Sequence, residues 1–148
     1  MTPTEPDTKP GKLRIRASMV CVHRAQLLCV RMRDPSTRVA RLFVPGGAIE
    51  VGETPAVAAE REALEETGYR IRADVESELV AHYPYEWDGE PRQIVTHFFR
   101  GQLLEPDAEP SPVNDANYHE GVVWLPLSEI VTTLGFNAVI LSAIEQLL

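Results

Sequence analysis

Apolar and polar positions alternate in several short runs along this chain. The runs LRIRASMVCV (13–22) and QLLCVRMR (26–33) are typical of β-strands, and only three residues separate them. They predict an antiparallel hairpin. The run RLFVPGG (41–47) predicts a third short strand that ends in a glycine turn.

A helix is predicted over residues 55–67, directly after this turn. Thr54 suits the N-cap, Pro55 suits the first helical position, and Gly68 suits the left-handed residue beyond the end. The predicted apolar stripe comprises Val57 and Leu64, with Ala56, Ala59 and Ala63 beside it, and Arg61 falls within it. The helix should therefore pack on a sheet through Val57 and Leu64.

The rest of the chain is predicted to hold three more strands and two helices. Residues 69–87 and 92–104 have strand composition, with Asp88-Gly89 as a tight-turn signal between them, and 120–127 is a further strand. Ser128 is expected to cap a short helix over 129–134, and 137–148 has the apolar spacing of a helix. The predicted fold class is therefore α/β with a mixed sheet.

Composition narrows the functional classes. The 148 residues suit one domain over 12–148, after a polar, proline-rich segment (1–11) that we expect to be a mobile tail. A formal charge of −8 argues against salt-driven binding to nucleic acid or to anionic membranes, so no stable nucleic-acid complex is expected. No apolar run is long enough to span a membrane, and Cys21 and Cys29 suit reduced core thiols. We expect a cytoplasmic protein.

Three glutamates crowd one face of the predicted helix. Glu62 and Glu66 lie one turn apart, which costs about 0.2–0.5 kcal/mol, and Glu65 joins them. A hard divalent cation such as magnesium, which binds carboxylates, would offset this repulsion. A solvated acidic face is the alternative for such a pattern taken alone. Arg61, on the apolar side, needs a carboxylate partner, and Glu53 is the nearest candidate.

The surrounding residues decide between these two interpretations. From Gly47, the stretch GAIEVGETPAVAAEREALEETGY follows the pattern G-x5-E-x7-R-E-U-x-E-E-x-G-U, where U is a bulky aliphatic residue. It resembles the Nudix box. Ala63 and Tyr69 depart mildly from the aliphatic positions of that pattern. The order of the flanking strands and of the C-terminal helix is also similar to that of a Nudix domain.

The resemblance implies an α/β/α sandwich that binds a divalent metal and hydrolyses a nucleoside diphosphate linked to another group. Magnesium is the expected ion, with manganese as the alternative. By that resemblance, the metal ligands are Glu62, Glu66 and the Gly46 carbonyl, with Glu65 as a ligand or a neighbouring group. Glu53 and Arg61 would pair to hold the helix against its loop.

The general base and the substrate stay open at this point. Glu62 is one candidate base, and Glu120, shortly before the strand that carries Trp124, is the other. Tyr85 and Trp87 share a strand face and could stack on a base or simply cover the sheet. The remaining candidate substrate contacts are Arg92, which also suits surface solvation, and Asn137, which also suits an N-cap.

Substrates consistent with the resemblance are a nucleoside triphosphate, a dinucleoside polyphosphate or ADP-ribose. A Nudix domain that binds a nucleotide as a sensor, without turnover, is the alternative function. Such modules often lose a carboxylate of the box, whereas all are present here. By analogy with relatives, the chain could form a homodimer.

Overall fold

A computed structural model describes residues 11–113 and 115–148. The strands are β1 (Lys12–His23), β2 (Gln26–Arg33), β3 (Ala40–Phe43), β4 (Gly46–Ala48), β5 (Ile71–Ala73), β6 (Leu79–Trp87), β7 (Glu90–Leu103) and β8 (His119–Pro126). The helices are α1 (Pro55–Thr67), α2 (Ile130–Leu134) and α3 (Ala138–Gln146), with short 3-10 turns η2 (Val75–Ser77) and η3 (Leu127–Glu129). The predicted tail falls almost wholly outside the described residues.

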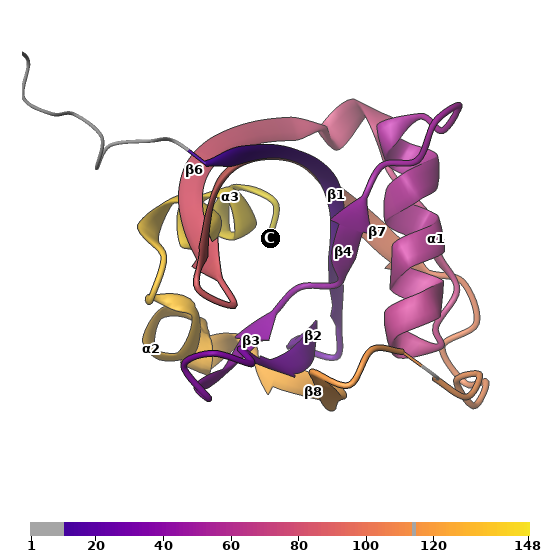
Figure 1. Ribbon diagram of the computed structural model, residues 1–148. Helices are drawn as coiled ribbons and strands as arrows, with labels where there is room; N and C mark the ends of the chain where they lie inside the picture. The colour runs from indigo at the N-terminus through magenta and orange to yellow at the C-terminus, as the bar shows by residue number, and fades with distance from the viewer. Residues whose placement is uncertain (1–10, 114) are drawn as a thin grey trace, which may run out of the picture.

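The long strand β1 organises the sheet (Figure 1). Ten of its residues, from Lys12 to Cys21, pair in parallel with β7, and its last residues form the predicted hairpin with β2. The remaining strands pair antiparallel with these three: β4 with β1, β5 and β6 with β7, and β3 and β8 with β2. The predicted mixed sheet is confirmed.

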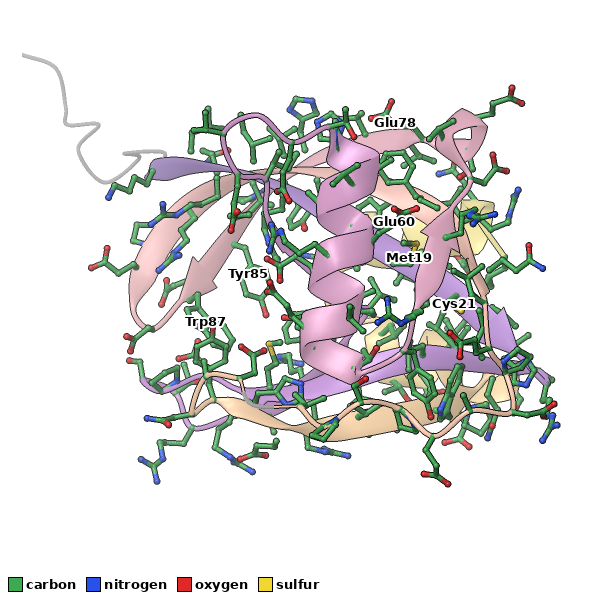
Figure 2. The ribbon with its side chains drawn as sticks, turned by 90° about the vertical axis from the view of Figure 1, so that its right-hand side faces the viewer. Met19, Cys21, Glu60, Glu78, Tyr85 and Trp87 are labelled. Atoms are coloured by element: carbon green, nitrogen blue, oxygen red, sulfur yellow. The ribbon has the colours of Figure 1, made fainter. Side chains whose placement is uncertain are left out.

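Helices cover both faces of the sheet (Figure 1). On one face α1 packs on a core that includes Met19, Leu28 and Phe99. On the opposite face α2 and α3 close a second core that includes Leu27 and Phe98. Figure 2 looks onto α1, which crosses the sheet on the face where Met19 and Cys21 of β1 lie. The molecule is therefore an α/β/α sandwich.

Helix α1 begins and ends where the sequence predicts. The Thr54 side chain accepts a hydrogen bond from the Val57 N–H, Pro55 is the first helical residue, and Gly68 has a φ of 78°. The predicted packing face is confirmed only in part. Ala59 and Ala63, beside the predicted stripe, are fully buried, but Val57 of the stripe is 49% exposed and Ala58, predicted on the other face, is fully buried. Small side chains let the helix backbone approach β1 closely, so proximity to the sheet decides the buried face here rather than side-chain size.

Two further local predictions are wrong. Residues 69–87 do not form one strand, because Asp74 starts the η2 turn by accepting a hydrogen bond from the Glu76 N–H, which separates β5 from β6. Ser128 does not cap a helix, because it lies inside η3, and α2 begins at Ile130 without a side-chain cap. The Asp88-Gly89 turn is confirmed, with a φ of 54° and 76° at its two residues.

Candidate active site

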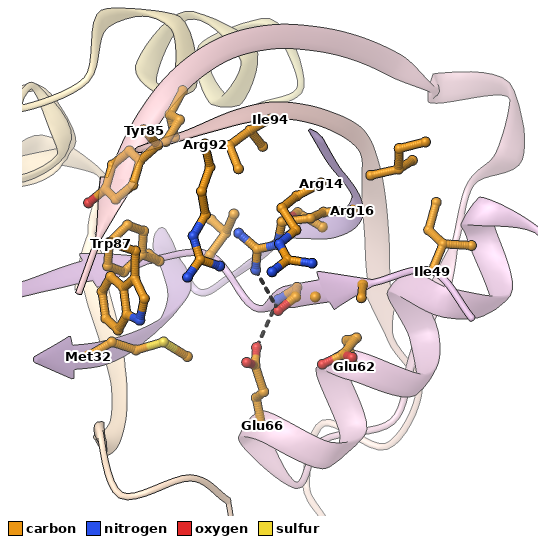
Figure 3. Close-up of a pocket in the computed structure, with 18 of the residues that line it drawn as sticks. Arg14, Arg16, Met32, Ile49, Glu62, Glu66, Tyr85, Trp87, Arg92 and Ile94 are labelled. Carbon is orange, nitrogen blue, oxygen red and sulfur yellow. Dashed lines mark hydrogen bonds between the residues drawn. The ribbon is translucent and has the colours of Figure 1, made fainter. Parts of the chain in front are cut away.

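A cavity of about 770 Å³ opens between α1 and the end of the sheet (Figure 3). Its walls come from α1, from β1 and β7, from the β4 turn and from the aromatic end of β6. The loop between β7 and β8 contributes Asp115 and Tyr118. The cavity therefore joins the glutamate-rich helix to segments far away in the sequence.

The α1 wall of the cavity is acidic. Glu66 is only 6% exposed, and its Oε1 accepts a 2.8 Å hydrogen bond from the Gly46 N–H. Burial raises the pKa of Glu66 to about 8, against the opposing effects of the Gly46 hydrogen bond and of Arg16. Burial also raises the pKa of Glu62, although Arg61 opposes this. Two neighbouring carboxylates are thus held where negative charge is costly.

The glycine turn before α1 fits closely around these carboxylates. A Cβ atom at Gly47 would overlap the carboxylate of Glu62, and a Cβ at Gly46 would overlap Ser18 and the Ala17 backbone. Glycine at both positions is therefore a steric requirement, because it brings the turn backbone against the carboxylates.

Arg61 ties the loop before α1 to the helix. Its Nε donates to Glu53 Oε2 at 2.6 Å and its Nη2 to Glu53 Oε1 at 2.9 Å, which is the expected pairing. Its Nη1 donates to Glu62 Oε1 at 3.0 Å and lies 3.3 Å from Glu65 Oε2. Its Nη2 also donates to the Ala48 carbonyl at 3.0 Å. The guanidinium of Arg61 lowers the pKa of Glu53 to about 2.

The wall opposite α1 is basic. Arg14, Arg16 and Arg92 line it, and Figure 3 shows their guanidinium groups directed toward Glu66 and Glu62. The Nη2 of Arg16 donates to the Gly46 carbonyl at 2.9 Å. Arg92 was a predicted contact, but Arg14 and Arg16 were missed. The signal was available, because LRIRAS places both arginines on the same face of a strand.

Aromatic rings close the far end of the cavity. Tyr85 and Trp87 both line it, as the predicted substrate contacts require (Figure 3). The rings of Trp87 and Tyr118 meet edge to face with centroids 5.4 Å apart, and Phe43 meets Tyr85 in the same manner at 6.1 Å. The cavity thus has a charged half and an aromatic half.

Four predicted site residues do not line this cavity: Glu53 and Arg61, which form the ion pair described above, and Glu120 and Asn137. The carboxylate of Glu120 binds Arg33, whose Nε donates to Oε2 at 2.7 Å and whose Nη2 donates to Oε1 at 3.2 Å. Asn137 caps α3, and its Oδ1 accepts from the Val139 and Ile140 N–H groups. Asp115 reaches the cavity from the same loop region as Glu120, and no sequence pattern singled it out.

The donor set suits a divalent cation in part. Among residues 11–113 and 115–148, no three His, Cys, Asp or Glu side chains are already gathered as a metal site. The buried carboxylate of Glu66 and the half-buried one of Glu62, beside a glycine turn, nevertheless match the oxygen ligands of magnesium, which keeps several waters. A cation beside Glu62 and Glu66 would offset the cost of burying their charges. The residues therefore fit a divalent ion.

Comparisons with known proteins agree with this geometry. The profile of the NUDIX domain matches residues 12–144. A NUDIX hydrolase from Nitrosomonas europaea is 23% identical, with a TM-score of 0.69 over 91% of this chain and 88% of its own. A MutT protein from Methanosarcina mazei Go1 is 17% identical, with a TM-score of 0.66 over 95% and 96%.

A third solved structure, the C. elegans Ap4A hydrolase, is 18% identical, with a TM-score of 0.63 over 90% of this chain and 93% of its own. These likenesses concern the fold. A search of curated proteins found no match. None of the helices in the described ranges is long and apolar enough to cross a membrane. The family match over most of the length shows that this chain belongs to the NUDIX domain family and is a hydrolase of pyrophosphate bonds.

Proposed function

We propose that this enzyme uses a divalent metal to cleave the diphosphate bond of a nucleoside diphosphate linked to another group. One observation carries the proposal: the buried carboxylate of Glu66 and the half-buried carboxylate of Glu62 face Arg14, Arg16 and Arg92 across one cavity. Carboxylates suit the metal, and guanidinium groups suit phosphate oxygens. An arrangement of both on facing walls suits a metal-bound phosphate chain between them.

Glu62 and Glu66 would hold the cation, with magnesium as the expected ion and manganese as the alternative. Glu65, whose Oε2 lies 3.3 Å from Nη1 of Arg61, would be a ligand or a neighbouring group. The Gly46 carbonyl, which accepts a hydrogen bond from Arg16, would be a further ligand. When bound, such a cation screens phosphate oxygens and lowers the pKa of a coordinated water. Glu53 and Arg61 fix the helix relative to the glycine turn, and so position both walls.

A carboxylate must take the proton of the attacking water. The water oxygen forms a bond to one phosphorus, the bond from that phosphorus to the bridging oxygen breaks, and the second phosphate leaves with that oxygen. Glu62 and Asp115 both line the cavity and can accept the proton. Glu120 is the weaker candidate, because its carboxylate already binds Arg33 outside the cavity.

The aromatic half of the cavity suits a nucleobase. Tyr85 and Trp87 would stack on it, and Arg92 would contact a phosphate oxygen. Asn137 has a complete local role as the cap of α3, so its proposed substrate contact has no support from its position. Nucleotides are the substrates named for the C. elegans neighbour, an Ap4A hydrolase, which agrees with this proposal.

Turnover assays test the proposal directly. We would measure phosphate and nucleotide release from nucleoside triphosphates, dinucleoside polyphosphates, ADP-ribose and nucleotide sugars, with magnesium, with manganese and with chelator. We expect metal-dependent release that Glu66→Gln lowers at least about 100-fold. Glu145→Gln, on the exposed face of α3, is the matched control. Nucleotide binding without any release would favour the sensor function instead.

A further inference from the structure

We propose that the substrate carries at least three consecutive phosphoryl groups, as a nucleoside triphosphate or dinucleoside polyphosphate does, because Arg14 and Arg92 form a second anion subsite opposite the α1 carboxylates. This inference rests on the proposed function and narrows its substrate class. It predicts discrimination against ADP-ribose and nucleotide sugars, which have only a diphosphate.

The strand register brings the three arginines of the basic wall together. Arg14 and Arg16 are two residues apart on β1 and therefore project to the same face. Arg16 pairs with Thr96, and Lys12 pairs with Arg92 on the parallel neighbour β7. Arg92 therefore lies diagonally beside Arg14, and Figure 3 shows the three guanidinium groups converging on the cavity.

Two of these three guanidinium groups have no hydrogen-bonding partner among the described residues. Arg16 donates to the Gly46 carbonyl and lies close enough to lower the pKa of Glu62 and of Glu66. The guanidinium groups of Arg14 and Arg92 make no ion pair or hydrogen bond within residues 11–113 and 115–148. Like charges held close together are unfavourable unless an anion neutralises them.

The acidic wall, formed by Glu62 and Glu66 of α1, would bind a diphosphate through its cation without help from Arg14 and Arg92. A cation on Glu62 and Glu66 would engage the two phosphoryl groups of the bond that is cleaved. Arg14 and Arg92 lie on the far side of the cavity from these glutamates, where a chain that continues past the diphosphate would pass. A third phosphoryl group adds negative charge at that point, and the planar guanidinium fork matches its oxygens.

The cavity also has room for such a chain. Its volume of about 770 Å³ lies in the upper part of the usual range for small-molecule sites, and the charged half is continuous with the aromatic half. A base against Trp87 would thus leave the charged half for the phosphates.

A substrate series crossed with arginine variants tests the inference. We would measure kcat/KM for ADP-ribose, for the adenine nucleoside triphosphate and for a diadenosine tetraphosphate, all with the same metal and ionic strength. The enzymes would be the unmodified chain, Arg14→Ala, Arg92→Ala and Arg14→Lys. Arg72→Ala is the matched control, since Arg72 is an exposed strand arginine outside the cavity.

We expect each alanine variant to lose about 10- to 100-fold in kcat/KM on the substrates with three or more phosphates, mostly through KM, and to show a severalfold smaller loss on ADP-ribose, whose diphosphate can still contact one of the two arginines. Arg14→Lys should keep part of the activity, because it keeps the charge without the fork. Equal losses on all substrates, or no loss at all, would overturn the inference. Melting temperatures would show that each variant is folded.

Failure of the proposed function has a different signature. If the unmodified chain releases no product with either metal, the same nucleotides are titrated by calorimetry in the presence of magnesium. Tighter binding of the triphosphate than of ADP-ribose, lost in Arg14→Ala, would still support the subsite. Equal binding of both ligands would overturn it.

Discussion

Arg61 and the Arg14–Arg92 pair face the same set of glutamates from opposite sides, but their surroundings differ. Arg61 donates to the carboxylates of Glu53, Glu62 and Glu65 and to a backbone carbonyl. The guanidinium groups of Arg14 and Arg92 have no such partner within the described ranges. An arginine whose donors are used within the protein holds structure together, whereas one without partners in a cavity is available to a ligand.

The same contrast separates two acidic residues, Asp115 in the β7–β8 loop and Glu120 near the start of β8. Glu120 binds Arg33 through both carboxylate oxygens and lies outside the cavity. Asp115 lines the cavity beside Tyr118 and makes no ion pair with a described residue. Its charge helps to raise the pKa of Glu66, after the larger effects of burial and of nearer groups. Asp115 is therefore the one with a free carboxylate at the site.

The largest expected effect is the loss of activity on replacing Asp115. If Asp115 takes the proton of the attacking water, Asp115→Asn should lower kcat about 100-fold, which is the lower end of the usual gain from a general base. Steady-state kinetics would measure kcat and KM of Asp115→Asn beside those of the unmodified enzyme.

Glu120→Gln is the matched variant for this test. Its activity should stay within about threefold of the unmodified enzyme, because the carboxylate is engaged by Arg33 away from the cavity. A large loss in Glu120→Gln with none in Asp115→Asn would reverse the assignment and favour Glu120, one of the two candidate bases that the sequence left open.

A second prediction concerns stability rather than chemistry. Arg61→Met should lower the free energy of unfolding by about 1–3 kcal/mol, because it removes the guanidinium group that pairs with the mostly buried carboxylates of Glu53 and Glu62. Arg72→Met, at an exposed strand position, should change it by less than about 0.5 kcal/mol. Urea denaturation would measure both. If Arg61→Met and Arg72→Met had equal free energies of unfolding, the contacts of Arg61 would not stabilise the fold, and the contrast with Arg14 and Arg92 would fail.

A third prediction is a pH dependence of stability in the presence of chelator, spread over several pH units. The pKa of Glu66 is raised to about 8, so the folded chain keeps a proton that the unfolded chain releases above its ordinary carboxyl pKa. The free energy of unfolding should therefore fall as pH rises from about 4.5 to about 8, by at most about 1.4 kcal/mol per pH unit for one proton.

Glu66→Gln should flatten this slope, and Glu145→Gln, at an exposed position of α3, should leave it unchanged. Denaturant midpoints at a series of pH values would measure the slope. A free energy of unfolding that rises through this window would contradict the burial of Glu66 as the dominant influence on its pKa.

The sequence by itself determined the local features of this protein. Thr54, Pro55 and Gly68 set the ends of α1 because caps depend on neighbouring backbone groups alone. The spacing of Glu62 and Glu66 put both carboxylates on one helix face, since the helical repeat is fixed. The Nudix-like pattern of residues 47–69 also predicted the fold. It predicted the Glu53–Arg61 pair as well, because both residues lie within that short segment.

Only the tertiary structure decided which distant groups meet at the cavity. The parallel register of β1 and β7 sets Arg92 beside Arg14. The loop that follows β7 brings Asp115 to the end of α1. Close approach of α1 to the sheet buried Ala58 in place of Val57. Each outcome depends on how separate elements pack, and side-chain periodicity within one element carries no information about that packing.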